Sequence, residues 1–548
     1  MAKINVQSAN IRYTDDLIEA DYQYDNVKCV HDPKNDSIKI YPMRSLITFR
    51  TKRTVPRTGL MLIGWGGNNG STVTAAIIAN RMKLSFPTKD GLVEANYFGS
   101  ITQSSTVFLG YDAKGQEVHV PMKNIVPMVD PNDLFIDGWD ISSWNLAESM
   151  ERAKVLDLGL QNQVREYMKD LKPRKAIYNL DFIAANQHDR ADNVLETQNK
   201  WAQVEQIRSD IRDFKAKHQL DTVIVLWTAN TERFSEILEG IHDTADNLLS
   251  AIKANHSELS PSALYAVASI LEKCSYINGS PQNTFVPGLI ELAEREKVYI
   301  GGDDFKSGQT KFKSVLVDFL VSAGIKPCSI VSYNHLGNND GYNLSAPQQF
   351  RSKEISKSNV VDDMVRSNQL IYGQGLKHPD HTVVIKYVPF VGDSKRAMDE
   401  YISELMLGGR NTIVVHNTCE DSLLASPIII DLVILTELCQ RITFKIHNQA
   451  KSDFQQFNSV LSILSYLLKA PMVERGSNVV NALFKQRQSI ENLLRALIAL
   501  PPINNLNLQP KCSDRDHWYE ELTQPVLKNE IIDSTRIAPP FNGFMNGH

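Results

Sequence analysis

One stretch of this chain decides its fold class: Leu60-Met61-Leu62-Ile63-Gly64-Trp65-Gly66-Gly67-Asn68-Asn69-Gly70-Ser71-Thr72. Its apolar residues predict a short buried strand, its glycines predict a tight turn, and a helix is expected to begin at Ser71 or Thr72. Such a turn presents backbone N–H groups and the positive end of a helix dipole to a phosphate. The stretch therefore predicts a dinucleotide-binding turn, although its third glycine, Gly70, comes one residue later than in the usual pattern.

Length and composition indicate a soluble globular protein of several structural units. The chain has 548 residues, which is too long for one ordinary core. Hydrophobic residues make up 42% and charged residues 22%, as in globular proteins. The net charge of -5 gives no general attraction for nucleic acid or for an acidic membrane. We therefore expect neither partner.

The chain shows no targeting, membrane or disulfide signal. No apolar leader follows Met1, and the most apolar stretch, Pro427–Leu435, is interrupted by Asp431 and is expected to be too short to cross a bilayer. Six cysteines without a Cys-x-x-Cys pair argue against a disulfide scaffold and a zinc ribbon. We expect a cytoplasmic enzyme.

From Gly59 onward, apolar runs alternate with helical patterns, which predicts a mainly parallel, doubly wound sheet. The runs are Thr222–Trp227, Val298–Ile300, Ile330–Ser332, Val383–Tyr387 and Thr412–Val415. Residues 1–58 are polar and are expected to form edge strands, while Asp431–Gln440 and Gln488–Leu500 are expected to be helices with apolar faces. Ligands of such sheets bind beyond the carboxyl ends of the strands, so the residues after each run are candidates.

Small polar residues are concentrated in the segments after four of the strands. The segments are Thr228–Glu232, Asn278–Thr284, Gly301–Thr310 and Asn334–Gly341. Each one alone is more often an ordinary turn, because these residue types dominate turns. Several such turns at the ends of successive strands predict a shared site.

Lysines give a second signal. Lys353 and Lys357 are four residues apart and would share one face of a helix, Lys395 follows a strand, and Lys485 lies in a helical stretch. Each alone is more often a solvated surface residue. Together in one pocket they would suit a phosphorylated carbonyl substrate, binding phosphate, polarising a carbonyl and moving a proton. A lysine base needs its pKa lowered by about 3 units, which burial beside other cations can supply.

Metal, hydrolase and P-loop signatures are missing from the sequence. His378 and His381 are separated by Pro379 and have no matching carboxylate, so we expect them to be loop residues and predict no metal site. The chain has neither a Gly-x-Ser-x-Gly elbow nor a Walker lysine.

Four long motifs carry a family resemblance: Gly64–Gly70, Leu226–Phe234, Asn278–Thr284 and Ser332–Gly341. Together they resemble eukaryotic myo-inositol-1-phosphate synthases, and the similarity runs from about residue 10 to about residue 500. The resemblance implies an isomerase of inositol and phospholipid biosynthesis that converts D-glucose 6-phosphate to 1D-myo-inositol 3-phosphate with tightly held NAD. The implied steps are oxidation at C5, enolisation, aldol closure between C6 and C1, and reduction at C5.

The resemblance also implies an α/β fold and a homotetramer. A Rossmann-type NAD-binding domain is expected with a second α/β catalytic and tetramerisation domain. The expected parts are residues 1–58 (N-terminal part of a central region), 59–310 (NAD-binding), 311–425 (catalytic and tetramerisation) and 426–548 (C-terminal part of the central region).

Family roles carried onto matching positions give the expected site. Gly66, Gly67, Asn68 and Asn69 should hold the pyrophosphate, and Asp140 the adenosine ribose. Further cofactor contacts are expected from Gln187, Arg190, Thr228, Ala229, Asn230, Thr231, Gly279, Asp304, Ser307, Asn338, Asn339, Asp340, Lys353, Asp393, Asp421 and Ser422. The expected catalytic residues are Lys353 for proton transfer, Lys395 and Lys485 for the enolate and alkoxide oxygens, Lys357 for phosphate, and Asp421 beside them.

Two other functions are compatible with parts of the sequence. The glycine-rich turn alone would permit a net NAD-dependent sugar-phosphate dehydrogenase. A non-catalytic NAD-binding scaffold is a third reading, which the lysine set argues against. The three differ in whether NADH accumulates and whether inositol phosphate forms.

Overall fold

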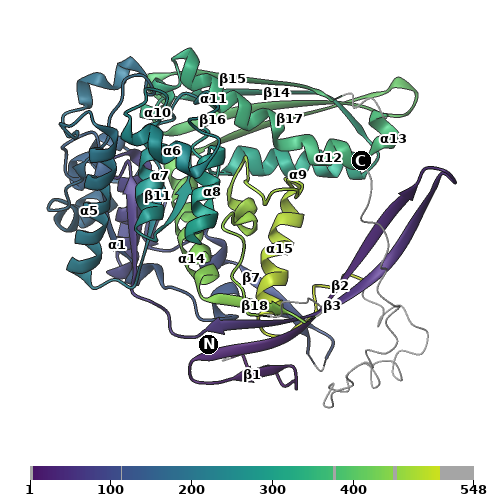
Figure 1. Cartoon of the computed structure of the whole chain (residues 1–548). Helices are drawn as coiled ribbons and strands as arrows, with labels where there is room; N and C mark the ends of the chain where they lie inside the picture. The colour runs from purple at the N-terminus through teal and green to yellow at the C-terminus, as the bar shows by residue number, and fades with distance from the viewer. Residues whose placement is uncertain (1–3, 113, 374–377, 448–452, 507–548) are drawn as a thin grey trace.

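A six-stranded parallel sheet lies at the centre of the cofactor-binding part in the computed structural model, which describes residues 4–112, 114–373, 378–447 and 453–506. Its strand order is β10-β9-β4-β11-β12-β13, and every neighbouring pair is parallel (Figure 1). The strands are β4 (Thr58–Ile63), β9 (Phe135–Asp140), β10 (Arg174–Lys175), β11 (Thr222–Trp227), β12 (Ser275–Asn278) and β13 (Ile300–Gly301). This arrangement confirms the predicted Rossmann-type domain.

Alternate residues of these strands enter two different cores. Leu60 and Leu62 of β4 belong to one hydrophobic cluster, and Met61 and Ile63 belong to the other. The first core is covered by α1 (Asn68–Arg81), α3 (Leu146–Ala153), α4 (Leu158–Met168) and α14 (Asp421–Gln440). The second is covered by α5 (Lys200–His218), α6 (Ala245–Lys253), α7 (Pro261–Leu271) and α8 (Pro287–Glu296). Because both faces are buried, the strands read as continuous apolar runs.

The later apolar runs form a second sheet, so the expectation of one mainly parallel sheet is wrong for them. Its order is β15-β14-β16-β17, and only β14 and β15 are parallel. The strands are β14 (Lys326–Leu336), β15 (Asp380–Tyr387), β16 (Ser394–Glu404) and β17 (Arg410–Glu420). The link between β16 and β17 is too short for a crossover helix, which makes this pair an antiparallel hairpin.

Helices cover one face of this second sheet. They are α9 (Gly308–Ser322), α10 (Asn339–Asn343), α11 (Pro347–Ser358), α12 (Asp362–Ser367) and α13 (Gln369–Tyr372). Val317 of α9, Ile330 of β14, Val365 of α12 and Tyr401 of β16 share a third hydrophobic cluster. Helix α15 (Leu483–Ala496) packs beside α9.

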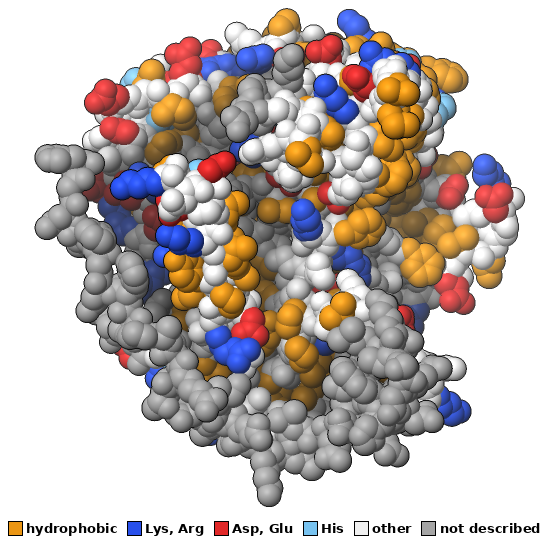
Figure 2. Space-filling model, turned by 90° about the vertical axis from the view of Figure 1, so that its right-hand side faces the viewer, with side chains coloured by type: hydrophobic (Ala, Val, Ile, Leu, Met, Phe, Trp, Pro, Cys, Tyr) orange, Lys and Arg blue, Asp and Glu red, His pale blue; other side chains and the backbone are white. Residues whose placement is uncertain are grey.

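The N-terminal strands pair with a strand from late in the chain. A four-stranded antiparallel sheet joins β1 (Ile11–Tyr13), β2 (Leu17–Asp32), β3 (Ser37–Lys52) and β18 (Ile442–Ile446). The β2–β3 hairpin projects from the molecule (Figure 1). Hydrophobic side chains gather on this side of the surface (Figure 2), and those exposed on the hairpin include Val27, Ile38, Ile40 and Met43.

Helix α14 passes through the core and carries a buried carboxylate. Asp431 accepts hydrogen bonds from Ser100 Oγ at 2.6 Å and from the backbone N–H groups of Ile101 and Thr102 at 2.8 and 3.0 Å. It thereby anchors the insertion between α1 and β9. This insertion contains β5 (Ser85–Thr88), β6 (Gly91–Glu94), α2 (Ile101–Ser104), β7 (Thr106–Tyr111) and β8 (Glu117–Pro121).

The apolar stretch Pro427–Leu435 is part of the longer helix α14. Among the described residues, α14 is the one helix whose length and composition would suffice. However, 83% of its most apolar window is buried inside the protein, which is typical of a core helix.

The glycine-rich turn is shorter than expected, because α1 begins at Asn68 rather than at Ser71 or Thr72. Gly64 has φ +88°, and a Cβ there would lie 2.6 Å from Ala229 Cα. Gly70 lies in the first turn of α1, where a Cβ would lie 2.3 Å from the Trp65 carbonyl oxygen. The absence of a Cβ at Gly70 therefore lets the first turn of α1 pack directly against the backbone of Trp65.

We predict that Gly70→Ala lowers the free energy of unfolding by about 1–3 kcal/mol, because the backbone of Trp65 must shift. Gly308→Ala is the matched control, since the atom nearest to its Cβ is the flexible Leu424 Cδ1 at 3.3 Å. Denaturation followed by circular dichroism measures both variants. Equal stability of the two would contradict the steric account of Gly70.

Candidate active site

One cleft lies where the ends of both sheets meet. The carboxyl ends of β4, β9, β11 and β12 face it, and so do the carboxyl end of β14, the start of β16 and the end of β17. The residues that line it include Gly67, Asn68, Asn69, Asp140, Arg190, Thr228, Ala229, Asn230, Thr231, Gly279, Asp304, Ser307, Asn338, Asn339, Asp340, Lys353, Lys395, Asp421, Ser422 and Lys469. Most of the residues expected from the sequence are therefore brought together.

The glycine-rich end of the cleft has room for a phosphate against backbone. Gly67 is the N-cap of α1 and no side chain caps the helix, so its first-turn N–H groups have no partner within the helix. Gly66 lies behind this turn, where a Cβ would be 3.1 Å from Asp140 Cγ. Asp140 accepts from the Ser142 N–H at 2.9 Å, and Arg190 Nη2 lies 3.9 Å from it. These features fit a pyrophosphate with a ribose beside it.

Arg152, which the sequence did not suggest, supports the same turn from α3. Its Nη2 donates to the Gly66 carbonyl at 2.9 Å. Burial, followed by the charge of Arg190, lowers the pKa of Arg152 to about 10.

Side-chain amides connect the two sheets across the cleft. Gln187 does not line the cleft, but its Oε1 accepts from Asn230 Nδ2 at 2.9 Å and from Asn339 Nδ2 at 2.8 Å. Asp340 Oδ1 accepts from the Thr231 N–H at 3.1 Å and from its hydroxyl at 3.2 Å. The loop after β11 and helix α10 are thus held together.

Asp393 makes a second connection just outside the lining. Its Oδ1 accepts from Asn68 Nδ2 at 3.0 Å and from Asn338 Nδ2 at 2.9 Å, and its Oδ2 accepts from the Ser422 N–H at 2.8 Å. Burial, and then the charge of Asp421, raises the pKa of Asp393. This carboxyl joins the starts of three helices, α1, α10 and α14.

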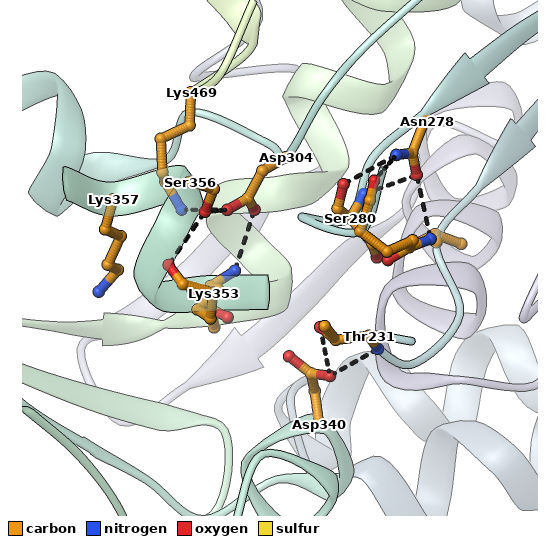
Figure 3. A network of polar contacts seen from close by, with 12 residues as sticks. Thr231, Asn278, Ser280, Asp304, Asp340, Lys353, Ser356, Lys357 and Lys469 are labelled. Atoms are coloured by element: carbon orange, nitrogen blue, oxygen red, sulfur yellow. Dashed lines mark hydrogen bonds and ion pairs between the residues drawn. The ribbon is translucent and has the colours of Figure 1, made fainter. Parts of the chain in front are cut away.

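Two lysines share the carboxylate of Asp304 (Figure 3). Lys353 Nζ lies 2.9 Å from Oδ1, and Lys469 Nζ lies 3.0 Å from Oδ2, which also accepts from the Ser356 hydroxyl at 2.8 Å. Asp304 itself is buried, but the charges of Lys353 and Lys469 overcome the effect of burial and lower its pKa. The carboxylate therefore stays ionised in the interior.

The two lysines on Asp304 differ in their pKa. Burial alone would lower the pKa of Lys353, but Asp304 and Asp340 offset it and raise the pKa. Burial lowers the pKa of Lys469 to about 7; Asp304 opposes this, whereas the charges of Lys353 and Lys395 add to it. Lys353 thus stays charged near neutral pH, and Lys469 can gain or lose a proton there.

Lys395 and Lys357 complete the cluster. Lys395 Nζ lies 3.3 Å from Asp421 Oδ1, and Lys395, followed by Lys353, lowers the pKa of Asp421 against the effect of burial. Lys357 lies behind the lining, on the same helix as Lys353, with its ammonium directed away from Asp304 (Figure 3). Burial first, and then Lys395, lowers its pKa well below that of an ordinary lysine.

Lys485 does not join this cluster, so its expected place beside the substrate is wrong within this chain. It lies on the exposed side of α15, whose buried side carries Leu483, Gln486 and Ile490.

Lys469 is instead the fourth lysine of the cluster. It follows the 3-10 helix Ser462–Leu467, and its N–H donates to the Asp304 carbonyl at 2.6 Å. Its sequence signal is weak: a lysine between an apolar run and Ala470-Pro471.

The expectation that His378 and His381 are loop residues is correct for His378 and wrong for His381. His378 lies outside the helices and strands, whereas His381 is in β15, with its Nε2 2.8 Å from Lys313 Nζ. Within the described part of the chain, no group of three or more His, Cys, Asp or Glu side chains could hold a metal ion.

Comparisons with known proteins agree with this geometry. A family model for myo-inositol-1-phosphate synthase matches residues 58–495. Inositol-3-phosphate synthase 1-B of Xenopus laevis is 65% identical over 540 residues, which cover 98% of this chain and 94% of that protein. Inositol-3-phosphate synthase 1 of Homo sapiens is 61% identical over 510 residues, which cover 93% and 90%.

A solved structure extends the agreement to the fold. The crystal structure of inositol-3-phosphate synthase from Caenorhabditis elegans has 53% sequence identity and a TM-score of 0.91, and the match covers 93% of this chain and 99% of that one. The chain therefore belongs to the myo-inositol-1-phosphate synthase family.

Proposed function

We propose that this protein converts D-glucose 6-phosphate to 1D-myo-inositol 3-phosphate with NAD, as the names of its relatives indicate. One observation carries the proposal: a dinucleotide-type turn and a cluster of lysines share one cleft. A simple dehydrogenase needs the turn but has no need for so many ammonium groups. Oxidation followed by carbon–carbon bond formation needs both.

The residues of the cleft suit NAD. The uncapped start of α1 would hold the pyrophosphate, and Asp140 would hold the ribose. Asn338, Asn339 and Asp340 would lie at the nicotinamide side, together with Asp421 and Ser422. When bound, NAD supplies reversible hydride exchange with C5 of the sugar.

The differing pKa values of the lysines suggest a division of labour. A ketone at C5 makes the hydrogens on C6 acidic, and a neutral amine is needed to remove one. The family resemblance suggests Lys353 for proton transfer; we propose Lys469 instead, because burial lowers its pKa to about 7. Lys353, held charged by Asp304, and Lys395 would stabilise the enolate oxygen that develops at C5.

Ring closure then depends on confinement of the open chain. C6 attacks C1, and the new oxyanion at C1 takes a proton. We propose that Lys357 binds the phosphate carried on C6, which fixes one of the two reacting carbons, while the lysines around Asp304 and Asp421 hold the oxygens at C5 and C1. Holding the two carbons within about 3–3.5 Å removes much of the entropic barrier.

We predict that the protein, given NAD and glucose 6-phosphate, forms inositol phosphate without accumulating NADH. Substrate carrying deuterium at C5 should keep the label, even with excess unlabelled NADH present, because the hydride returns to the carbon that it left. Mass spectrometry of the product and absorbance of NADH measure both outcomes. One NADH per turnover would favour the dehydrogenase, absence of both products would favour the scaffold, and loss of most deuterium would exclude a closed redox cycle.

We predict that Lys469→Ala lowers turnover by about 10²-fold or more, the scale of a lost general base. The control Lys485→Ala should keep near wild-type activity, because Lys485 is exposed on α15. Lys469 accepts a proton only when neutral, so wild-type kcat/KM should rise as pH is raised through about 7. The Lys469→Ala variant should lack this rise. Near-normal activity of Lys469→Ala would remove it from the mechanism.

We also propose that the chain acts in the cytoplasm as a homotetramer, with the division into parts at residues 58, 310 and 425 that the family resemblance suggests. The exposed apolar side chains of the β2–β3 hairpin support a self-association surface.

We predict that light scattering gives a mass four times that of the chain. Replacing both Ile38 and Ile40 by Glu should reduce this mass, because the two side chains are among the more exposed apolar groups on the hairpin. Leu158→Glu, at an exposed apolar position on α4, should leave the mass unchanged. A monomeric wild-type protein would refute the proposal.

A further inference from the structure

A fifth lysine is buried next to the cluster, and the reaction described above does not use it. Lys313 comes from α9, and its side chain is buried. Its Nζ donates to the Ser332 hydroxyl at 2.7 Å and lies 2.8 Å from His381 Nε2. Within the described part of the chain, no carboxylate forms an ion pair with Lys313, although Asp399 lies close enough to raise its pKa.

Strand β14 holds Lys313 and Lys357 side by side. Ser332 binds Lys313, and Asn334 Oδ1 accepts from Lys357 Nζ at 3.3 Å. Because Ser332 and Asn334 are alternate residues of one strand, their side chains leave the same face, about 6–7 Å apart along β14. Both are buried. Two ammonium groups from different helices are therefore neighbours in the interior.

Burying two ammonium groups side by side lowers the stability of the fold, which favours a functional role for their charge. Burying an ammonium group without a counter-charge opposes folding, and an apolar side chain of similar volume would avoid that penalty. The groups that face Lys357 are Lys353 on its own helix, Lys313 on α9, Lys395 on β16 and Lys469. All four of these groups are lysines. Lys313 is the member that touches neither Asp304 nor Asp421.

We propose that Lys313 is a positioning residue that acts through Lys357: its ammonium, on the same face of β14, helps to keep Lys357 uncharged until an anionic group enters beside it. A phosphate dianion would then draw a proton onto Lys357, and binding and protonation would occur together. The assignment of this anion to the substrate phosphate rests on the proposed function; the electrostatic coupling of the two lysines does not.

The pKa directions agree with this placement. Burial lowers the pKa of Lys313 to about 8, with Asp399 opposing the shift. Burial lowers the pKa of Lys357 well below that of an ordinary lysine, and Lys395, Lys469, Lys313 and Lys353 add to this effect in that order. The charge of Lys313 therefore adds to the effects that favour the uncharged form of Lys357.

The test is trace acetylation of each lysine across the pH range in which lysines titrate, with the peptides quantified by mass spectrometry. The pKa is read from the pH at which acetylation is half-maximal and not from the total amount of acetylation, so slow labelling of a buried lysine does not affect it. In Lys313→Met the midpoint of Lys357 should rise by about one pH unit or more, because a charge a few ångströms away is lost. Lys313→Arg, which keeps the charge, should leave the midpoint near that of the wild type.

Lys311→Met is the matched control. Lys311 lies on the same helix, over the Tyr466 ring, and is not among the charges that act on Lys357. Its removal should leave the Lys357 midpoint unchanged. An unchanged midpoint in Lys313→Met would overturn the proposal, and so would a rise as large in Lys311→Met.

Proton uptake gives a second readout that needs no turnover. Titration calorimetry with inorganic phosphate, in two buffers of different ionisation enthalpy near neutral pH, should show proton uptake by the wild type and less than half as much in Lys313→Met. Thermal stability of Lys313→Met should be equal or higher, because a buried charge is removed. Lower stability with the same proton uptake would show a structural role and refute the proposal. If no inositol phosphate forms, the proposed function fails while these measurements still decide the role of Lys313.

Discussion

Asp304 holds ammonium groups from two distant parts of the chain, Lys353 on α11 and Lys469 after the 3-10 helix Ser462–Leu467. The carboxylate lies beyond the end of β13, the edge strand of the parallel sheet. Helix α11, which carries Lys353, packs against β15 of the second sheet. One buried side chain therefore ties together three parts of the molecule. Removing one partner would leave a buried charge unpaired, which is far more destabilising than losing a surface ion pair.

Two neighbouring lysines that share one carboxylate can still differ in their pKa, because their other neighbours differ. Lys353 is close to a second acid, Asp340, whereas the next charges to act on Lys469 are the cations Lys353 and Lys395. A hydrogen-bonded loop fixes Asp340, since Thr231 donates to it twice. The loop after β11 thus influences Lys353 through Asp340, and a shift of Asp340 away from Lys353 would lower the pKa of Lys353.

The sequence was most informative where a local pattern matched a local structure. The run Thr222–Trp227 has the same bounds as β11, because a doubly buried strand is apolar throughout. The i,i+4 spacing of Lys353 and Lys357 correctly put both on one helix, α11. Strand direction could not be predicted in this way: β14 and β17 contain short apolar runs, but the links between strands determine whether neighbouring strands are parallel or antiparallel.

The site was harder to predict where its residues come from loops. Lys469 has no periodic pattern around it and is placed by backbone hydrogen bonds to residues 303 and 304. Lys485, by contrast, lies in a helix whose apolar residues indicate which side is buried, because Leu483 and Ile490 face inward. The helix start was misplaced for a related reason: asparagines favour turns, yet Asn68 and Asn69 form the first turn of α1.

The pairing of β3 with β18 has a consequence for synthesis. The outer edge of β3 finds its partner only when residues 442–446 have been made, roughly 400 residues later. At about 5–20 residues per second, this edge waits roughly 20–80 s on the ribosome. During that time residues 47–51 of β3 present an unpaired strand edge, which is a template for association with other nascent chains. Yield in cells should therefore depend on how well the β2–β3 hairpin is shielded during translation.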